Sequence, residues 1–133
     1  MKFFYKRYAP GLFRPVIPIE IKANTKSVRY EALIDSGADL CIFDGQIAQV
    51  LGISVRKGQK RFVGGITGTE RPFFVHPVLI LIGGWDYEIA AGFMPDLPPF
   101  GYGVLGQKGF FEHFIVKFDY SKAEIEVRPK LSN

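Results

Sequence analysis

Alternating apolar and polar residues predict β-strands along much of the chain. Residues 16–23 (VIPIEIKA) alternate in this way, and residues 27–35 (SVRYEALID) alternate at first and then become continuously apolar as they approach Asp35. Residues 40–43 (LCIF) resume or end the same sheet. Successive side chains of a strand point to opposite faces, so a period of two indicates a strand with one face in a core. The pattern therefore predicts strands on both sides of an acidic turn.

A short helix is predicted directly after these strands. Residues 44–53 (DGQIAQVLGI) place apolar side chains at i, i+3 and i+4, the spacing of one helical face. Asp44 is the expected N-cap, and Gly52 is the expected residue at which the helix stops. The spacing allows a short helix at most.

The second half of the chain continues with strand pairs. Residues 61–75 are predicted to form a hairpin around a glycine-rich tip, and residues 76–84 and 86–94 a second strand pair that turns near Gly83-Gly84-Trp85. Residues 95–102 form a proline-rich loop in this interpretation.

The end of the chain adds a helix and two more strands. Residues 103–114 pass from an apolar pair into a predicted helix, and residues 114–129 alternate as two strands around a Tyr-Ser-Lys turn. No internal repeat and no linker interrupts the pattern. The sequence predicts an all-β domain with about two short helices, and the simplest organisation is one domain over residues 1–133.

Composition agrees with a packed, globular β protein. The 133 residues are 47% hydrophobic and include 13 Phe and 6 Tyr, which argues against disorder. The 15 Gly and 9 Pro are scattered, as expected for many turns between short strands. The net charge of +4 is spread along the chain, and the densest basic segments, residues 6–8 and 55–62, are interpreted as solvated loops. We therefore expect no nucleic-acid partner.

Residues that often carry other chemistry favour structural roles here. Cys41 is the only cysteine, so no internal disulfide can form, and its place between two apolar residues is typical of a core position. His76 and His113 show no metal-ligand spacing with it, and we expect no metal and no cofactor. The segment GGITG lacks the Lys-Ser/Thr ending of a phosphate loop.

The sequence also bears on location. The first 13 residues have no continuous apolar segment of the kind found in signal peptides, and the apolar run at residues 78–82 is far too short to span a bilayer. We expect a cytoplasmic protein without a membrane partner.

The candidate chemistry lies in Asp35-Ser36-Gly37, at the end of an apolar strand. Such a strand holds the carboxylate rigidly, and Gly37 allows another backbone or a substrate to approach closely. The same three residue types are also common in ordinary turns, so two interpretations stay open from these residues alone. Ser36 lacks the Gly-x-Ser-x-Gly setting of a hydrolase nucleophile.

Three segments in this order resemble the retropepsin-like aspartic proteases, the family of retroviral proteases and their cellular and bacterial relatives. Those proteins have an apolar strand that ends in Asp-Thr/Ser-Gly-Ala, then a glycine-rich flap, and then a hydrophobic-hydrophobic-Gly strand before a helix. The corresponding segments here are ALIDSGA at 32–38, GGITG at 64–68 and VLG at 104–106. The resemblance covers residues 15–128, and it implies a closed acid-protease β-barrel.

The resemblance assigns roles to single residues. It implies that Asp35 is the catalytic aspartate, that Ser36, Gly37 and Ala38 form the active-site loop, and that Asp39 contacts the substrate backbone. The flap that closes over a peptide would consist of Gly64, Gly65, Ile66, Thr67 and Gly68. Ile66 and Val104 are expected to line side-chain pockets, which favours hydrophobic residues around the cleaved bond.

Two features depart from the retroviral members. They have Arg directly after the glycine of the hydrophobic-hydrophobic-Gly segment, where this chain has Gln107, so an Asp39–Arg ion pair is absent. The strand pair at 114–129 extends beyond the retroviral pattern, and the layout is closer to that of cellular and bacterial members. We therefore expect a dimer interface that is built differently.

The second carboxylate of an aspartic protease must come from a second chain. Only Asp35 has the Asp-Thr/Ser-Gly pattern, whereas Asp44, Asp86, Asp96 and Asp119 lack it. The resemblance thus implies a homodimer in which two copies of Asp35 meet on a two-fold axis, share one proton and cleave an extended peptide.

Two alternatives remain from the sequence. The chain could be a dimerisation or peptide-binding module that keeps the fold without turnover, or the processing domain of a larger polyprotein. The initiating Met1 and the coverage of the whole fold favour a stand-alone aspartic endopeptidase.

Overall fold

The computed structural model describes residues 1–64, 70–95 and 101–130. Within these ranges the chain is mostly β, with one α-helix, α1 (Gly45–Val50), and one 3-10 turn, η1 (Val55–Lys57). The strands in chain order are β1 (Lys2–Phe4), β2 (Lys6–Ala9), β3 (Leu12–Arg14), β4 (Val16–Ala23), β5 (Lys26–Ile34), β6 (Ile42–Asp44), β7 (Gln59–Gly64), β8 (Glu70–Ile82), β9 (Trp85–Met94), β10 (Gly103–Leu105), β11 (Phe114–Asp119) and β12 (Glu124–Pro129).

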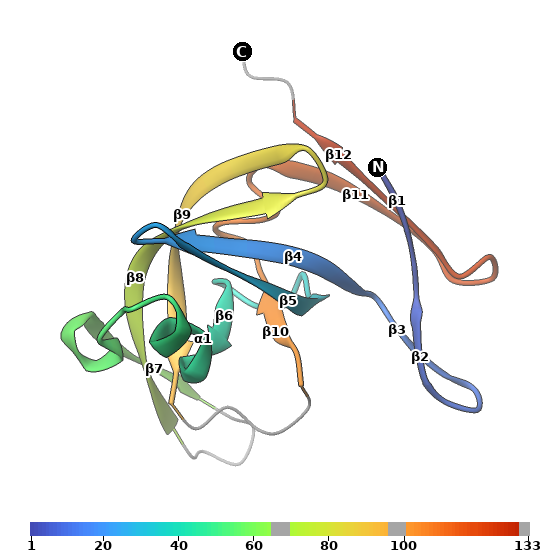
Figure 1. Ribbon diagram of the computed structural model, residues 1–133. Helices are drawn as coiled ribbons and strands as arrows, with labels where there is room; N and C mark the ends of the chain where they lie inside the picture. Colours follow the sequence, from blue (N-terminus) through green and yellow to red (C-terminus); the bar gives the residue numbers. More distant parts are fainter. Residues whose placement is uncertain (65–69, 96–100, 131–133) are drawn as a thin grey trace.

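The central sheet closes on itself. Its strands lie in the order β4-β5-β10-β6-β9-β8-β7, and β8 also pairs with β4, so that the sheet forms a ring (Figure 1). In the middle, β10 runs parallel to β5 and antiparallel to β6, so a strand from late in the chain lies between two early strands. The predicted closed barrel is confirmed.

Alternation along the strands builds the core inside this ring. On β4, Ile17, Ile19 and Ile21 are buried while the residues between them are exposed or half-buried. Phe43 and Phe93 meet at the centre with their ring centroids 5.9 Å apart in an edge-to-face arrangement. Such pairs stabilise the fold by about 0.5–1.5 kcal/mol beyond the stabilisation from burying their surface. The core thus fixes the strands that end at the acidic turn.

The helix at α1 follows the sequence prediction. The Asp44 side chain accepts a hydrogen bond from the Gln46 N–H at 3.0 Å, as an N-cap does. Gly52 has a φ of +74°, which a glycine adopts without strain and which stops the helix. In the part of the chain that the structure describes, no helix has the length and apolar content that crossing a membrane requires.

The helix predicted within residues 103–114 is wrong. Residues 103–105 form β10, and residues 107–113 form a series of turns. Gly109 has a φ of +97°, which a right-handed helix cannot contain, so the apolar spacing of this segment does not become helical. The spacing instead buries Phe110 and Phe114 against the core.

The strand boundary predicted between residues 75 and 76 is also wrong. Residues 70–82 form one continuous strand, β8, which pairs with β7 at its start and with β9 over its second part. The β8–β9 hairpin turns at Gly83-Gly84, as expected. Residues 65–69, which contain the predicted tip of the β7–β8 hairpin, lie outside the described residues.

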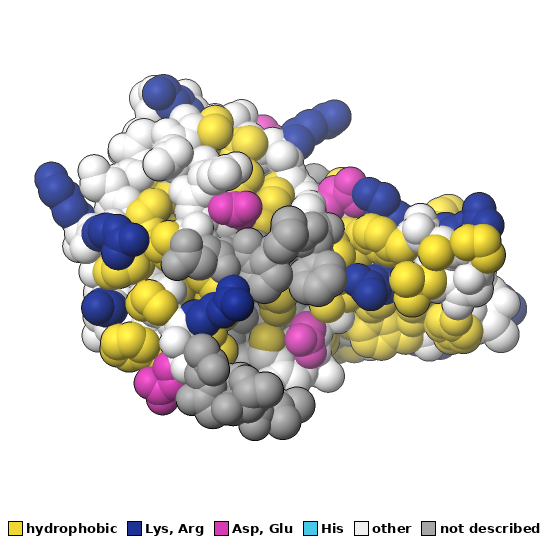
Figure 2. Space-filling view, turned by 90° about the horizontal axis from the view of Figure 1, so that it is seen from below, with side chains coloured by type: hydrophobic (Ala, Val, Ile, Leu, Met, Phe, Trp, Pro, Cys, Tyr) yellow, Lys and Arg dark blue, Asp and Glu magenta, His cyan; other side chains and the backbone are white. Residues whose placement is uncertain are grey.

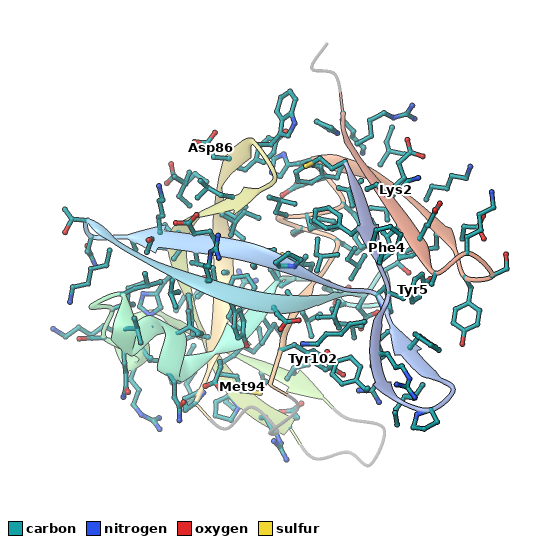
Figure 3. The ribbon with its side chains drawn as sticks, turned by 45° about the vertical axis from the view of Figure 1, so that its right-hand side comes forward. Lys2, Phe4, Tyr5, Asp86, Met94 and Tyr102 are labelled. Atoms are coloured by element: carbon teal, nitrogen blue, oxygen red, sulfur yellow. The ribbon has the colours of Figure 1, made fainter. Side chains whose placement is uncertain are left out.

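The first 14 residues form strands that the alternation did not predict. β1 pairs with β12 in a small sheet with β11, whereas β2 and β3 form a separate two-stranded hairpin that projects from the body (Figures 1 and 3). Lys6 of β2 forms an ion pair with Glu31 of β5 at 2.6 Å. Tyr102, next to β10, packs its ring against that of Tyr8, 5.9 Å between centroids. These contacts attach the hairpin to the body.

Cys41 is fully buried, and we expect it to be unreactive in the folded protein. Burial raises the pKa of its thiol from 9.0 to about 11. At about pH 8 this shift alone lowers the thiolate fraction about 100-fold, so labelling with a disulfide reagent should be at least that much slower than in the urea-unfolded chain. Rapid labelling of the folded protein would contradict a core role for Cys41.

The same shift predicts a loss of stability in alkali. Because the pKa of Cys41 is higher in the folded state, the neutral thiol contributes to stability below about pH 9, and this contribution disappears as the pH rises through about 11.

Candidate active site

Asp35 is the first residue after β5, and two neighbouring strands hold it in place. Its N–H donates to the Leu105 carbonyl at the end of β10, at 3.0 Å. The preceding Ile34 N–H donates to the Pro15 carbonyl, between β3 and β4, at 2.9 Å. The Asp35 side chain is half-buried, so its carboxyl group stays accessible from solvent. The apolar strand thus delivers one carboxyl group at a fixed position.

The carboxyl group also shapes the loop that follows it. The Asp35 Oδ1 atom accepts a hydrogen bond from the Gly37 N–H at 2.9 Å, and the Asp35 carbonyl accepts one from the Ala38 N–H at 3.2 Å. This local bonding is that of an Asx turn, in which an aspartate side chain takes the place of a backbone acceptor. Ser36 and Gly37 lie exposed at the tip of the turn.

The residues after β10 form the other support of the loop. The Gln107 N–H donates to the Ala38 carbonyl at 2.8 Å, and its side-chain amide donates a very short hydrogen bond to the Ser36 carbonyl. The Lys108 N–H donates to the Asp39 carbonyl at 3.0 Å. Gln107 therefore braces the loop of residues 35–38 within its own chain.

Gly106 makes this close approach possible. A Cβ atom at this position would lie 2.3 Å from the Leu40 carbonyl oxygen and 2.6 Å from that of Ala38. Both contacts are with backbone atoms, which cannot swing away as a side chain can. The glycine of the VLG segment is thus a packing requirement of the loop that holds Asp35.

A pocket of about 690 Å³ opens beside the loop, under β7. This volume is within the usual range for ligand sites. Its lining combines the loop after Asp35, strand β7, single residues of β6 and β8, and the residues after β10: Gly37, Ala38, Asp39, Leu40, Ile42, Arg61, Phe62, Val63, Gly64, Phe73, Gln107 and Lys108. Phe62 is 56% exposed and Val63 is 37% exposed, so β7 presents apolar side chains to solvent beside the pocket.

The structure brings several of the predicted site residues together. Gly37, Ala38, Asp39 and Gly64 line the pocket, and Asp35 and Ser36 belong to the same turn just beside it. Val104 lies within β10, paired with Leu33 and Ile42, and is not part of this lining. The predicted flap residues Gly65, Ile66, Thr67 and Gly68 lie outside the described residues. The roles of all these residues stay predictions.

Several residues of the site carried no recognisable signal in the sequence. Arg61 and Phe62 come from a fully exposed strand, and Lys108 comes from a turn that was predicted as helix. The resemblance identified Gln107 only as a departure. The one available signal was the position of Gln107 directly after the VLG segment, which places it beside the loop.

The described residues contain no group of three or more His, Cys, Asp or Glu side chains that could hold a metal ion. Among the described residues, Asp39 is the one other carboxylate next to the Asp35 turn. The side chains of Asp35 and Asp39 share no hydrogen bond. The described residues of one chain thus present a single Asp-Ser-Gly carboxyl group at this turn.

This fold and this loop define a class of structure. No family model and no curated protein matches the sequence, but the structure matches those of retropepsin-like aspartic proteases. The chain has the retropepsin-like fold, including the strand–Asp-Ser-Gly turn and the glycine that follows β10.

Two solved structures illustrate the match. A retropepsin-like aspartic protease from Rickettsia conorii superposes with a TM-score of 0.66 at 18% identity, over 96% of this chain and 89% of that chain. EIAV protease, solved in complex with the inhibitor HBY-793, superposes with a TM-score of 0.55 at 24% identity, over 71% of this chain and 82% of that chain. The bacterial structure thus extends over more of the chain than the viral one.

Proposed function

We propose that the protein is a homodimeric aspartic endopeptidase. The observation that carries this proposal is the fixed geometry around Asp35. An apolar strand, an Asx turn and the Gln107 brace hold one accessible carboxyl group beside an open pocket in a retropepsin-like fold. A plain surface turn requires neither the brace nor the glycine packed beneath it.

The chemistry needs two carboxyl groups that share one proton. When two such groups lie close together, their repulsion splits the titration of the pair into two steps, and one group stays protonated while the other is ionised. The ionised group of the Asp35 pair would take a proton from a water molecule, which attacks the peptide carbonyl carbon. The protonated group would donate its proton to the carbonyl oxygen. Either subunit can supply the protonated Asp35, and the other then supplies the ionised one.

The substrate would be an extended peptide. The exposed strand β7 covers the pocket, and a peptide held between it and the active-site loop would form backbone hydrogen bonds in the manner of an added strand. The apolar side chains of Phe62, Val63 and Phe73 would bind apolar side chains of the peptide.

The projecting β2–β3 hairpin is an argument for a dimer contact near Asp35. β3 ends at Arg14, and the next residue, Pro15, bonds to the residue directly before Asp35. The end of the hairpin at Arg14 therefore lies close to Asp35, which follows the sequence-distant strand β5. In the proposed dimer, Asp35 of the partner subunit would lie near this end. Leu12 and Phe13 on the hairpin and Phe4 before it are exposed, and Figure 2 shows hydrophobic side chains gathered on this projecting part. Exposed apolar patches of this kind are typical of protein interfaces.

The test is cleavage of a mixed peptide library between about pH 4 and 7 over a range of protein concentrations, with sedimentation measured in parallel. We expect specific activity to rise with concentration as dimers form, and a bell-shaped pH dependence set by the Asp35 pair. A protein that sediments as a strict monomer with constant specific activity would contradict the two-chain site. A dimer that binds peptides without cleaving them would instead support a peptide-binding module.

A further inference from the structure

The pocket beside Asp35 has two basic side chains on different walls. Arg61 comes from β7, and Lys108 comes from the turn after β10. The same pocket is lined by apolar side chains: Leu40, Ile42, Phe62, Val63 and Phe73. Figure 2 shows basic and hydrophobic side chains side by side on the face seen from below.

Neither basic group is neutralised by an acidic side chain among the residues that the structure describes. The ion pairs found there are Lys2–Glu124, Lys6–Glu31 and His113–Glu112, all outside the pocket lining. Among the described residues, Arg61 donates one long hydrogen bond, 3.4 Å, to the neutral side chain of Gln59. The Gln107 amide, the remaining polar side chain nearby, is bonded to Ser36.

Among the described residues of the lining, Asp39 is the only acidic side chain, so within this set the two basic groups exceed it by one charge. Asp39 is exposed and forms no ion pair with Lys108, although the backbones of these two residues are bonded at 3.0 Å. The resemblance implies that Asp39 contacts the substrate backbone. An acidic side chain of the substrate could then form ion pairs with Arg61 and Lys108.

We propose that this pocket selects peptides that carry an Asp or Glu side chain next to the apolar residues bound beside the cleaved bond. The proposal rests on the proposed peptidase function and adds a substrate class to it. Solvent-exposed charge pairs of this kind change affinity by about 2–5-fold each, so two of them predict a preference of about 4–25-fold for an acidic over a neutral side chain. The preference should weaken at high salt, because salt screens exposed charges.

The experiment compares matched peptides that differ only by Glu or Gln at one position. From the library cleavage sites, kcat/KM is measured for both peptides with the wild-type protein and with Arg61→Gln, Lys108→Gln and the double variant. We expect the Glu/Gln ratio of about 4–25 to fall in each single variant and to approach one in the double variant. Arg61→Glu should favour a Lys peptide instead. Lys26→Gln is the matched control, because Lys26 lies at the start of β5, away from the pocket.

Binding separates the failure of this inference from the failure of the proposed function. The same peptides are titrated against Asp35→Asn, and thermal unfolding confirms that each variant is folded. If no peptide is cleaved but Glu peptides bind more tightly, the charge selection stands and the peptidase proposal fails. Equal kcat/KM and equal Kd for the Glu and Gln peptides, or a preference that survives in the double variant, would overturn the inference.

Discussion

Replacing Asp35 with asparagine is expected to lower kcat/KM for peptide cleavage by about 10²–10⁴-fold, the range that general acid–base catalysis contributes. Asparagine has nearly the same shape but cannot take a proton from water at neutral or acidic pH. The Oδ1 atom of asparagine can still accept the Gly37 N–H, which bonds to Asp35 at 2.9 Å. The variant should therefore keep the fold and the turn and lose only the chemistry.

Mixed dimers make this result specific to a two-chain site. When equal amounts of wild type and Asp35→Asn exchange subunits, about a quarter of the dimers carry two Asp35 carboxyl groups. We expect the activity per total protein to fall to about this fraction of the wild-type value. If each chain carried a complete site, about half of the activity would remain, and a result at that level would contradict the shared site.

Gly106→Ala is expected to destabilise the protein by about 3 kcal/mol, which is large for a single methyl group. The added Cβ atom would lie 2.3 Å from the Leu40 carbonyl oxygen, so either β10 or the active-site loop must move. The movement would also disturb the Gln107 contacts and therefore reduce activity in the molecules that remain folded. Urea unfolding measures the first effect, and kcat measured well below the unfolding midpoint measures the second.

The matched control for Gly106→Ala is Gly84→Ala. Gly84 lies in the exposed turn between β8 and β9, and a Cβ atom there would meet nothing within 4 Å. We expect a change within about 0.5 kcal/mol, as is usual for surface substitutions. Equal losses in both variants would mean that the cost reflects the glycine backbone rather than the packing under the loop.

The sequence predicted those parts of the structure that depend on local patterns. β4 was predicted at its observed bounds because its side chains alternate, and α1 was predicted because Asp44 and Gly52 mark its ends. Residues 107–113 have helical spacing, but the φ of +97° at Gly109 and the packing of Phe110 cannot be inferred from spacing. β2 and β3 are too short to display a period.

The candidate site also combines features that a local pattern predicts with features that depend on contacts between distant segments. The local setting of Asp35, an apolar strand and an Asp-Ser-Gly turn, made it a candidate but left an ordinary turn open as well. Its predicted catalytic role came from the resemblance of three segments in order, at residues 32–38, 64–68 and 104–106. The brace from Gln107 and the basic side chains of Arg61 and Lys108 join segments far apart in the chain. Their arrangement depends on the pairing of β10 with β5 and on the position of β7, which no local pattern specifies.

The unbroken course of β8 has a mechanical consequence. At Glu70–Phe73 the strand pairs with β7 alone, whereas at Leu79–Leu81 it has partners on both sides, β9 and β4. The hairpin over the pocket therefore has no separate hinge on this side. We expect the described part of β7 and β8 to move as one unit, anchored where β8 joins the barrel wall beyond the buried Phe73 and Phe74. Amide hydrogen exchange should accordingly slow along a single strand, from its first residues to its last.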